Sequence, residues 1–168
     1  LFNIEINSAK ESFNKILLAS GGSERSFELA KSLGHTIVPP VPSLFTFEIE
    51  NELIKDLPGV SFKKAEATLR FGKRSYKNIG PLLITHWGLS GPCVIVLSSL
   101  CARELYDVGY HAELRVNFLT HLSLEKAQNS IKTFRNSNLK KKIINAKAFE
   151  LPNSFWERIL DIAKLKHD

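Results

Sequence analysis

Several common features are absent from the sequence, and each absence excludes a class of protein. The 168 residues contain no methionine and only two cysteines. No apolar run approaches the roughly 20 residues that a membrane-spanning helix needs, and the N-terminus lacks the charged-then-apolar layout of a secretory signal. The chain opens directly in an alternating strand pattern at residues 2–6. We therefore expect a segment of a longer chain rather than a trimmed short protein, and no membrane partner.

The two cysteines, Cys93 and Cys101, lie eight residues apart. On one helix this spacing separates them by about 12 Å along the axis, beyond the roughly 7 Å between Cα atoms that a disulfide allows. We expect two small buried thiols in a reducing compartment, which indicates a cytoplasmic protein. The sequence has neither a CxxC pair nor a Cys/His cluster with metal-ligand spacing, so it predicts no metal site.

The net charge is +6, and much of the basic excess lies in the last third of the chain. The acidic residues Glu125, Glu150 and Glu157 lie nearby, and aromatic residues are not interleaved as they are in single-strand binding platforms. A solvated helix face is therefore the favoured interpretation, and nucleic acid is not an expected partner. A nucleic-acid or protein binding module that uses the Lys132–Lys147 region stays open as the alternative. The basic residues are Lys126, Lys132, Arg135, Lys140, Lys141 and Lys142.

The first 34 residues have the pattern of a short α/β unit. Apolar and polar residues alternate over 2–6, which predicts a half-exposed strand, and residues 13–19 are apolar enough for a strand buried on both faces. A glycine turn at 20–22 follows, and then a helix over 23–33 capped by Ser23. In α/β sheets ligands bind at such turns, because the helix start presents free N–H groups.

The centre of the chain is rich in strand patterns. The stiff, proline-rich stretch at 38–42 predicts an extended spacer between domains, and Gly80–Pro81 predicts a break between two strands. Ser90 is expected to cap a buried helix over 93–108, with Pro92 in its first turn and Gly109 at its end. The expected strands cover 44–50, 60–71, 74–77, 82–86 and 110–119, and the expected C-terminal helices cover 123–136, 139–148 and 152–165.

These patterns predict an α+β fold. Its β-rich body is expected to be barrel-like, with a mixed sheet and one buried helix, and a small helical subdomain follows it. A short α/β piece stands at the N-terminus. The expected divisions are 1–34, 36–122 and 123–168.

The stretch THWGLSGP, residues 85–92, carries the strongest candidates for chemistry. A strand is expected to end here, the chain to reverse at Gly88, and a helix to begin with exposed N–H groups that attract anions. A histidine changes charge near neutral pH, so His86 is the candidate acid or base, and an indole stacks on flat ligands. The alternative is structural, because small residues also let a helix approach a sheet closely. The candidate catalytic residues are His86, Thr85 and Ser90, and the candidate substrate-pocket residues are Trp87, Gly88 and Gly91.

The common catalytic signatures are otherwise absent. The sequence holds no Ser/His/Asp set with a familiar spacing, no GxSxG elbow and no GxGxxG dinucleotide fingerprint. It does resemble the HI0933-like family of FAD-dependent oxidoreductases in colinear order along almost the whole chain. The segments that carry this resemblance are KILLASGG, LAKSLGHTIVPPVPSLFTF, LPGVSF and GPLLITHWGLSGPCVIVLS.

The resemblance implies that residues 1–34 border a flavin domain and that 36–168 form its large insert. The ATGG-like turn that lies against FAD in the family carries over to Ala19, Ser20, Gly21 and Gly22. The sequence departs from the family at Ser20, where threonine is usual, and at 23–25, where a glycine-rich stretch is shortened. The implied function is a FAD-dependent oxidoreductase whose insert covers the flavin and shapes the pocket. This piece is then inactive alone, binds no FAD by itself, and has the rest of its own chain as its partner.

Overall fold

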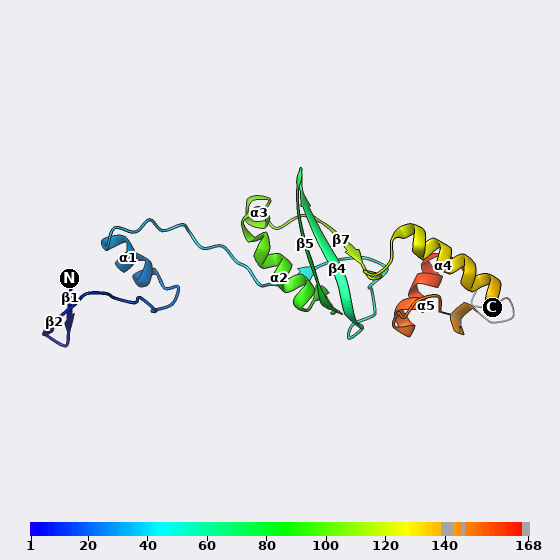
Figure 1. Ribbon diagram of the computed structural model, residues 1–168, viewed down its shortest axis with the longest axis horizontal. Coiled ribbons are helices and arrows are strands. Elements are labelled where there is room, and N and C mark those ends of the chain that lie inside the picture. Colours follow the sequence, from blue (N-terminus) through cyan, green and yellow to red (C-terminus); the bar gives the residue numbers. More distant parts are fainter. Residues whose placement is uncertain (139–142, 146, 166–168) are drawn as a thin grey trace. The chain divides into compact units, whose positions relative to one another are not determined.

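The computed structural model describes residues 1–138, 143–145 and 147–165, and it divides into two units, Leu1–Pro40 and Val41–Asp168. Figure 1 shows both units and labels their helices and strands. The division falls within the expected spacer, where consecutive prolines have no backbone N–H to contribute to regular structure. Each unit is described by itself below.

The first unit contains one hairpin and one helix. Strand β1 (Phe2–Ile6) pairs antiparallel with β2 (Ala9–Phe13), and helix α1 spans Glu24–Ser32. The Oγ of Ser23 accepts a hydrogen bond from the Ser26 N–H at 3.3 Å, so Ser23 is the N-cap that the sequence predicted. The expected first strand and helix are both confirmed.

The buried strand expected at 13–19 is wrong. Residues 9–13 form β2 after a turn at Asn7 and Ser8, and residues 14–19 have no regular structure. The Leu17 side chain is 89% exposed. A hairpin partner that follows after two turn residues closes a very short loop, and this local pairing costs little chain entropy. An apolar segment without a strand to pair with stays exposed.

The second unit is built on a curled, five-stranded sheet in the order β3-β6-β5-β4-β7. All four strand pairs are antiparallel. The expected barrel-like body is confirmed, but the sheet is not mixed. Short turns connect β4 to β5 and β5 to β6, and hairpins of this kind join only antiparallel strands. The strands are β3 (Phe47–Glu48), β4 (Ser61–Phe71), β5 (Arg74–Ile84), β6 (Gly88–Ser90) and β7 (Glu113–Asn117).

Strand β5 runs unbroken through Gly80 and Pro81, where the sequence predicted a break. Phe62 pairs with Leu82 and Ala65 with Gly80, so two residues of β4 lie opposite Pro81. This is a β-bulge, and a bulge is one of the few places in a sheet that tolerates a residue without an N–H. The proline therefore marks a bulge rather than an end.

Strand β3 is much shorter than the expected 44–50. Leu44 has a φ of 60°, which turns the chain away from strand geometry. The Phe45 N–H donates to the Ser98 Oγ at 3.0 Å, so this part of the backbone is bonded to the buried helix. The alternating sequence pattern could not show that the Ser98 hydroxyl on the helix, rather than a neighbouring strand, accepts the hydrogen bond of the Phe45 N–H.

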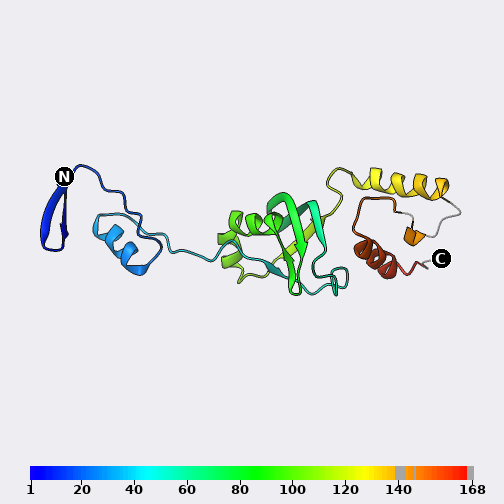
Figure 2. The same ribbon diagram turned by 90° about the horizontal axis from the view of Figure 1, so that it is seen from below.

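The buried helix packs against one face of the sheet (Figure 2). It consists of α2 (Pro92–Leu100) and α3 (Ala102–Asp107), with a break at Cys101, whose φ is −122°. The fully buried side chains of Ala65 and Ala67 on β4 are small enough for the helix to approach the sheet closely. The expected burial is confirmed, although the helix is broken once.

The C-terminal part consists of α4 (Leu124–Ser137), the 3₁₀ turn η1 (Ile143–Asn145) and α5 (Asn153–Ile162). Of the helix expected at 139–148, only η1 is seen, and Lys140, Lys141 and Lys142 lie outside the described residues. The buried ring of Phe155 lies 4.9 Å from that of Phe62 on β4, so this part shares the core of the barrel. No helix in the described part of the chain is long and apolar enough to cross a bilayer.

Candidate functional site

Residues 85–88 form a tight turn between β5 and β6, and Thr85 holds it closed. The Thr85 N–H donates to the Gly88 carbonyl oxygen at 2.8 Å. The Thr85 hydroxyl donates to the same oxygen at 3.3 Å and accepts from the Trp87 N–H at 3.4 Å. Thr85 therefore fixes the conformation of the turn, and its suggested catalytic role stays a prediction.

Gly88 and Gly91 are positions where a side chain does not fit. A Cβ on Gly88 would lie 2.3 Å from the Phe47 carbonyl oxygen, and one on Gly91 would lie 2.9 Å from that of Pro81. Both glycines also have a positive φ, 148° and 93°. The structural alternative for these two glycines thus has direct support, because they let β3 and β5 approach the turn and the helix start.

Ser90 does not cap the buried helix. It is the last residue of β6, where it pairs with Leu83, and the N-cap position belongs to Gly91, which makes no side-chain cap hydrogen bond. The helix start also packs on β5, since a Cβ on Gly80 would lie 3.4 Å from the Cys93 nitrogen. The expected capping role is wrong because the short strand β6 takes up the residue that the pattern assigned to the cap.

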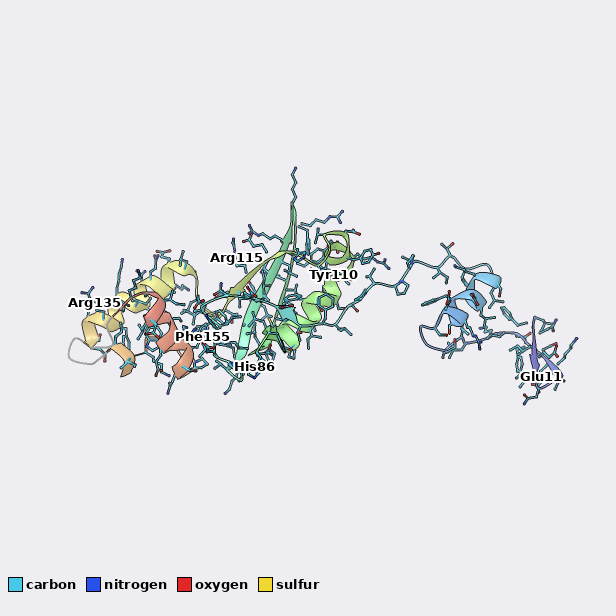
Figure 3. All side chains as sticks on the ribbon, turned by 180° about the vertical axis from the view of Figure 1, so that it is seen from behind. Glu11, His86, Tyr110, Arg115, Arg135 and Phe155 are labelled. Carbon is cyan, nitrogen blue, oxygen red and sulfur yellow. The ribbon has the colours of Figure 1, made fainter. Side chains whose placement is uncertain are left out.

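His86 and Trp87 form the exposed tip of the turn. The Trp87 side chain is 75% exposed, and His86 is exposed as well. Figure 3 shows His86 at one end of the sheet. Among the described residues the imidazole makes no hydrogen bond or ion pair, so its ring is available to a ligand. A rigid turn thus presents one acid–base group and one flat aromatic surface to solvent.

A cleft of about 820 Å³ lies beside this tip. Thr85, His86 and Gly88 line it together with residues 49–52, 54–56 and 58, whereas Trp87, Ser90 and Gly91 are not among its lining residues. The structure thus brings three of the six predicted turn residues into one cavity. The volume falls within the range of cavities that hold small ligands.

The wall of the cleft that residues 50–56 form is acidic, and no pattern in the sequence had indicated it as part of the site. Glu50, Glu52 and Asp56 line the cavity, and Lys55 forms an ion pair with Glu52 at 3.3 Å. The signal was present as a run of carboxylates over 48–56 directly after a strand. Within the described residues no group of three or more His, Cys, Asp and Glu is arranged to hold a metal ion. The wall disfavours phosphate groups and favours neutral or cationic parts of a ligand.

The predicted cofactor-binding residues Ala19, Ser20, Gly21 and Gly22 lie in the first unit and are exposed. Gly21 has a φ of 76° with nothing within 4 Å of a Cβ position, and the Ser20 carbonyl oxygen accepts from the Ser26 hydroxyl at 3.3 Å. An exposed backbone corner of this kind fits close approach by a flavin. It offers no side chain that could hold the ring, so these residues fit a contact to FAD and not a complete site.

Comparison with known proteins identifies the family. The family model of the HI0933-like protein barrel and H2TH domain matches residues 41–168. The chain belongs to the HI0933-like family. The barrel in the family description agrees with the curled sheet, and the matched range includes both the His86 turn and the C-terminal helices.

Three curated proteins are similar to the chain. A 3-dehydro-bile acid delta(4,6)-reductase of Clostridium scindens is 27% identical over 71% of this chain and 31% of its own length. A ribosomal RNA dihydrouridine synthase of Escherichia coli is 25% identical over 98% of this chain and 40% of its own. The enzyme of that name in Haemophilus influenzae is 29% identical over 58% and 26%. The chain therefore spans well under half the length of these relatives.

Proposed function

We propose that this chain is the barrel and helical part of a FAD-dependent reductase, in which it covers the isoalloxazine ring and shapes the substrate pocket. The observation that carries the proposal is the pair of exposed side chains, His86 and Trp87, on a turn held by Thr85 and Gly88 beside a ligand-sized cleft. Within the described residues the His86 ring has no hydrogen-bond or ion-pair partner, and backbone contacts hold the turn that carries it. Such a ring can act on a ligand that enters the cleft.

The other segments of the flavoprotein would hold most of the cofactor, and they are this chain's main partner. From this chain, the backbone of residues 19–22 would contact FAD, since it is exposed and includes a positive φ at Gly21. The flavin, when bound, supplies hydride transfer. The chain alone is then expected to be colourless, and the compartment that suits its two free thiols is the cytoplasm.

The reaction that these groups support is reduction of a carbon–carbon double bond. The π bond breaks, one carbon gains a hydride and its neighbour gains a proton, and a two-electron donor such as a nicotinamide nucleotide restores the reductant. His86 would donate the proton from its imidazolium ring, and Trp87 would stack on a planar unsaturated ring. The acidic wall at Glu50 and Asp56 would keep anionic groups of the substrate out of the cleft.

The names of the relatives suggest two substrate classes, a bile acid and ribosomal RNA. We favour a nucleobase of RNA, because the Escherichia coli relative aligns with 98% of this chain and because an exposed tryptophan is a common stacking surface for bases. This departs from the expectation that nucleic acid is not a partner, which considered only the C-terminal lysines. A stand-alone binding module built on those helices has no support from the comparisons.

The experiment uses the full-length flavoprotein that contains this chain. Replacing His86 and Trp87 together by alanine should leave FAD content and flavin reduction unchanged and lower substrate turnover by at least about 100-fold. The matched control is His121→Ala, an exposed histidine outside the lining of the cleft. Equal turnover in both variants, or loss of FAD from the double variant alone, would refute the proposed role.

A further inference from the structure

The hairpin formed by β4 and β5 concentrates positive charge. Residues 61–84 carry six basic side chains and one acidic side chain, a net charge of +5 within a chain whose total is +6. The neighbouring segment 48–56 is acidic. The basic side chains are Lys63, Lys64, Arg70, Lys73, Arg74 and Lys77, and all six are exposed.

The strand register brings Arg115 into one row with Lys77, on the sheet face opposite the one where Arg74 pairs with Phe71. Thr68 on β4 lies directly between Lys77 on β5 and Arg115 on β7, and Figure 3 labels Arg115 on that strand. Neighbouring positions across antiparallel strands have Cβ atoms about 5 Å apart, so the two cations lie about 10 Å apart over Thr68. Their side chains are on the sheet face opposite the one that buries Ala67 and Leu69, because residues alternate between faces.

Three of the seven cations form ion pairs with carboxylates of the chain, and one of these pairs joins Arg74 to Glu104 at 3.5 Å. Lys77 lies 3.6 Å from Glu66, and Arg115 lies 3.6 Å from Glu113. Exposed pairs of this kind contribute little and exchange readily for other anions. Arg70 takes part in no ion pair within the described part of the chain, and neither does Lys73.

The cations extend along the hairpin from near the His86 turn to its far end. Lys63 and Lys64 lie in the bulge opposite Pro81, four residues or about 13 Å from Thr85 along the strand. Lys73 lies in the two-residue turn, where Gly72 has a φ of 60°. The eleven residues of β5 span about 33 Å between these ends. A single phosphate could contact only a few of these cations, whereas a polymer with regularly spaced negative charges could contact cations along the whole hairpin.

We infer that the β4–β5 hairpin, together with Arg115, is the surface that binds the phosphate backbone of an RNA substrate. The inference rests on the proposed function, since it assigns the backbone to the hairpin and the target base to the His86 cleft. The acidic wall excludes phosphates from the cleft, whereas the basic hairpin attracts them at about 13–40 Å from Thr85 along the strand. Such contacts position the chain without reading its sequence.

The test measures RNA binding by the 168-residue chain itself. A fluorescently labelled single-stranded RNA of about 20 nucleotides is titrated by anisotropy at several salt concentrations. Wild-type affinity should fall with salt, with a slope of about −0.7 in log–log form per phosphate contact. The triple variant R70Q/K73Q/K77Q should lower the magnitude of that slope by about 2 and weaken binding at low salt by at least about tenfold.

The matched control is K10Q/K15Q/K31Q, which removes the same charge from exposed lysines of the first unit. The inference fails if this control weakens binding as much as the hairpin variant, or if the hairpin variant binds like the wild type. It also fails if vesicles of phosphatidylserine compete with the RNA at equal charge concentration, because the surface would then be a general membrane contact. RNA binding that depends on the hairpin, in a flavoprotein that reduces no RNA, would refute the proposed function and leave this surface standing.

Discussion

Gly88 and Phe47 approach each other so closely that a Cβ on the glycine would lie 2.3 Å from the Phe47 carbonyl oxygen. Phe47 belongs to β3 and pairs with Leu89, and the Ile49 N–H donates to the Trp87 carbonyl oxygen at 2.9 Å. The backbone of β3 therefore lies directly against the turn that carries His86. This contact restrains the turn, and the residues that follow β3, from Ile49 onward, line the cleft.

Gly88→Ala should destabilise the second unit by at least about 3 kcal/mol, since the new methyl group must displace backbone atoms as well as adopt a strained φ. Gly109→Ala is the matched control, because Gly109 has a φ of 62° and nothing within 4 Å of its Cβ position. It should cost only about 1–2 kcal/mol. Urea denaturation gives both free energies of unfolding, and equal values would show that the close approach is not tight.

The Tyr76 hydroxyl donates a hydrogen bond to Glu104, which ties β5 to α3. This bond, with the nearby Arg74 guanidinium making a smaller contribution, lowers the pKa of Glu104, and the same bond raises the pKa of Tyr76. A lowered carboxyl pKa gives stability that is present above the ordinary value of about 4.3 and is lost as the pH falls through the folded-state pKa. The raised phenol pKa gives stability that is present below about 10 and is lost as the pH rises.

Tyr76→Phe should therefore move the pKa of Glu104 up toward its ordinary value and remove part of the acid dependence of unfolding. The readouts are the carboxyl chemical shift of Glu104 and urea denaturation between about pH 3 and 7. Both residues are partly accessible, so the effect on stability should be modest. A Glu104 pKa that does not change in the variant would mean that the hydrogen bond is not formed in solution.

Both cysteines should resist alkylation in the folded protein. Burial raises the pKa of the Cys93 thiol, and burial with a smaller contribution from the Glu104 charge raises the pKa of Cys101 to about 11. Because the thiolate is the reactive form, iodoacetamide at neutral pH should label neither cysteine natively and both in urea. Mass spectrometry counts the labels, and rapid native labelling would contradict the burial of this helix.

Local rules predicted those elements whose signals lie within a few residues. Ser23 caps its helix as expected, and Ser123 caps α4 in the same way, because a cap needs only its own hydroxyl and the first turn. Ser90 matches the same capping pattern but caps no helix, because it belongs to β6 and pairs with Leu83 of β5. Similarly, the position of Pro81 inside a strand is explained only by the β-bulge opposite it. Competition from distant segments was not visible in either pattern.

For the same reason, only the part of the candidate site that lies within one short stretch of sequence could be predicted. The tip at His86 and Trp87 follows from an unusual local sequence, whereas the acidic wall of Glu50 and Asp56 joins it through the fold. The basic hairpin could have been found by counting charges over 61–84, but its continuity with Arg115 depends on the register between β4 and β7. Only pairing across the sheet brings Lys77, Thr68 and Arg115 into one row.

The most direct test of the central claim is single-turnover reoxidation of the reduced flavin by substrate in the full-length flavoprotein carrying His86→Gln. If His86 supplies the proton, reoxidation should slow by about 10²–10⁴-fold, while the rate of flavin reduction stays unchanged. A reoxidation rate equal to that of the wild type would contradict the claim and leave residues 85–92 with a purely structural role in packing the helix against the sheet.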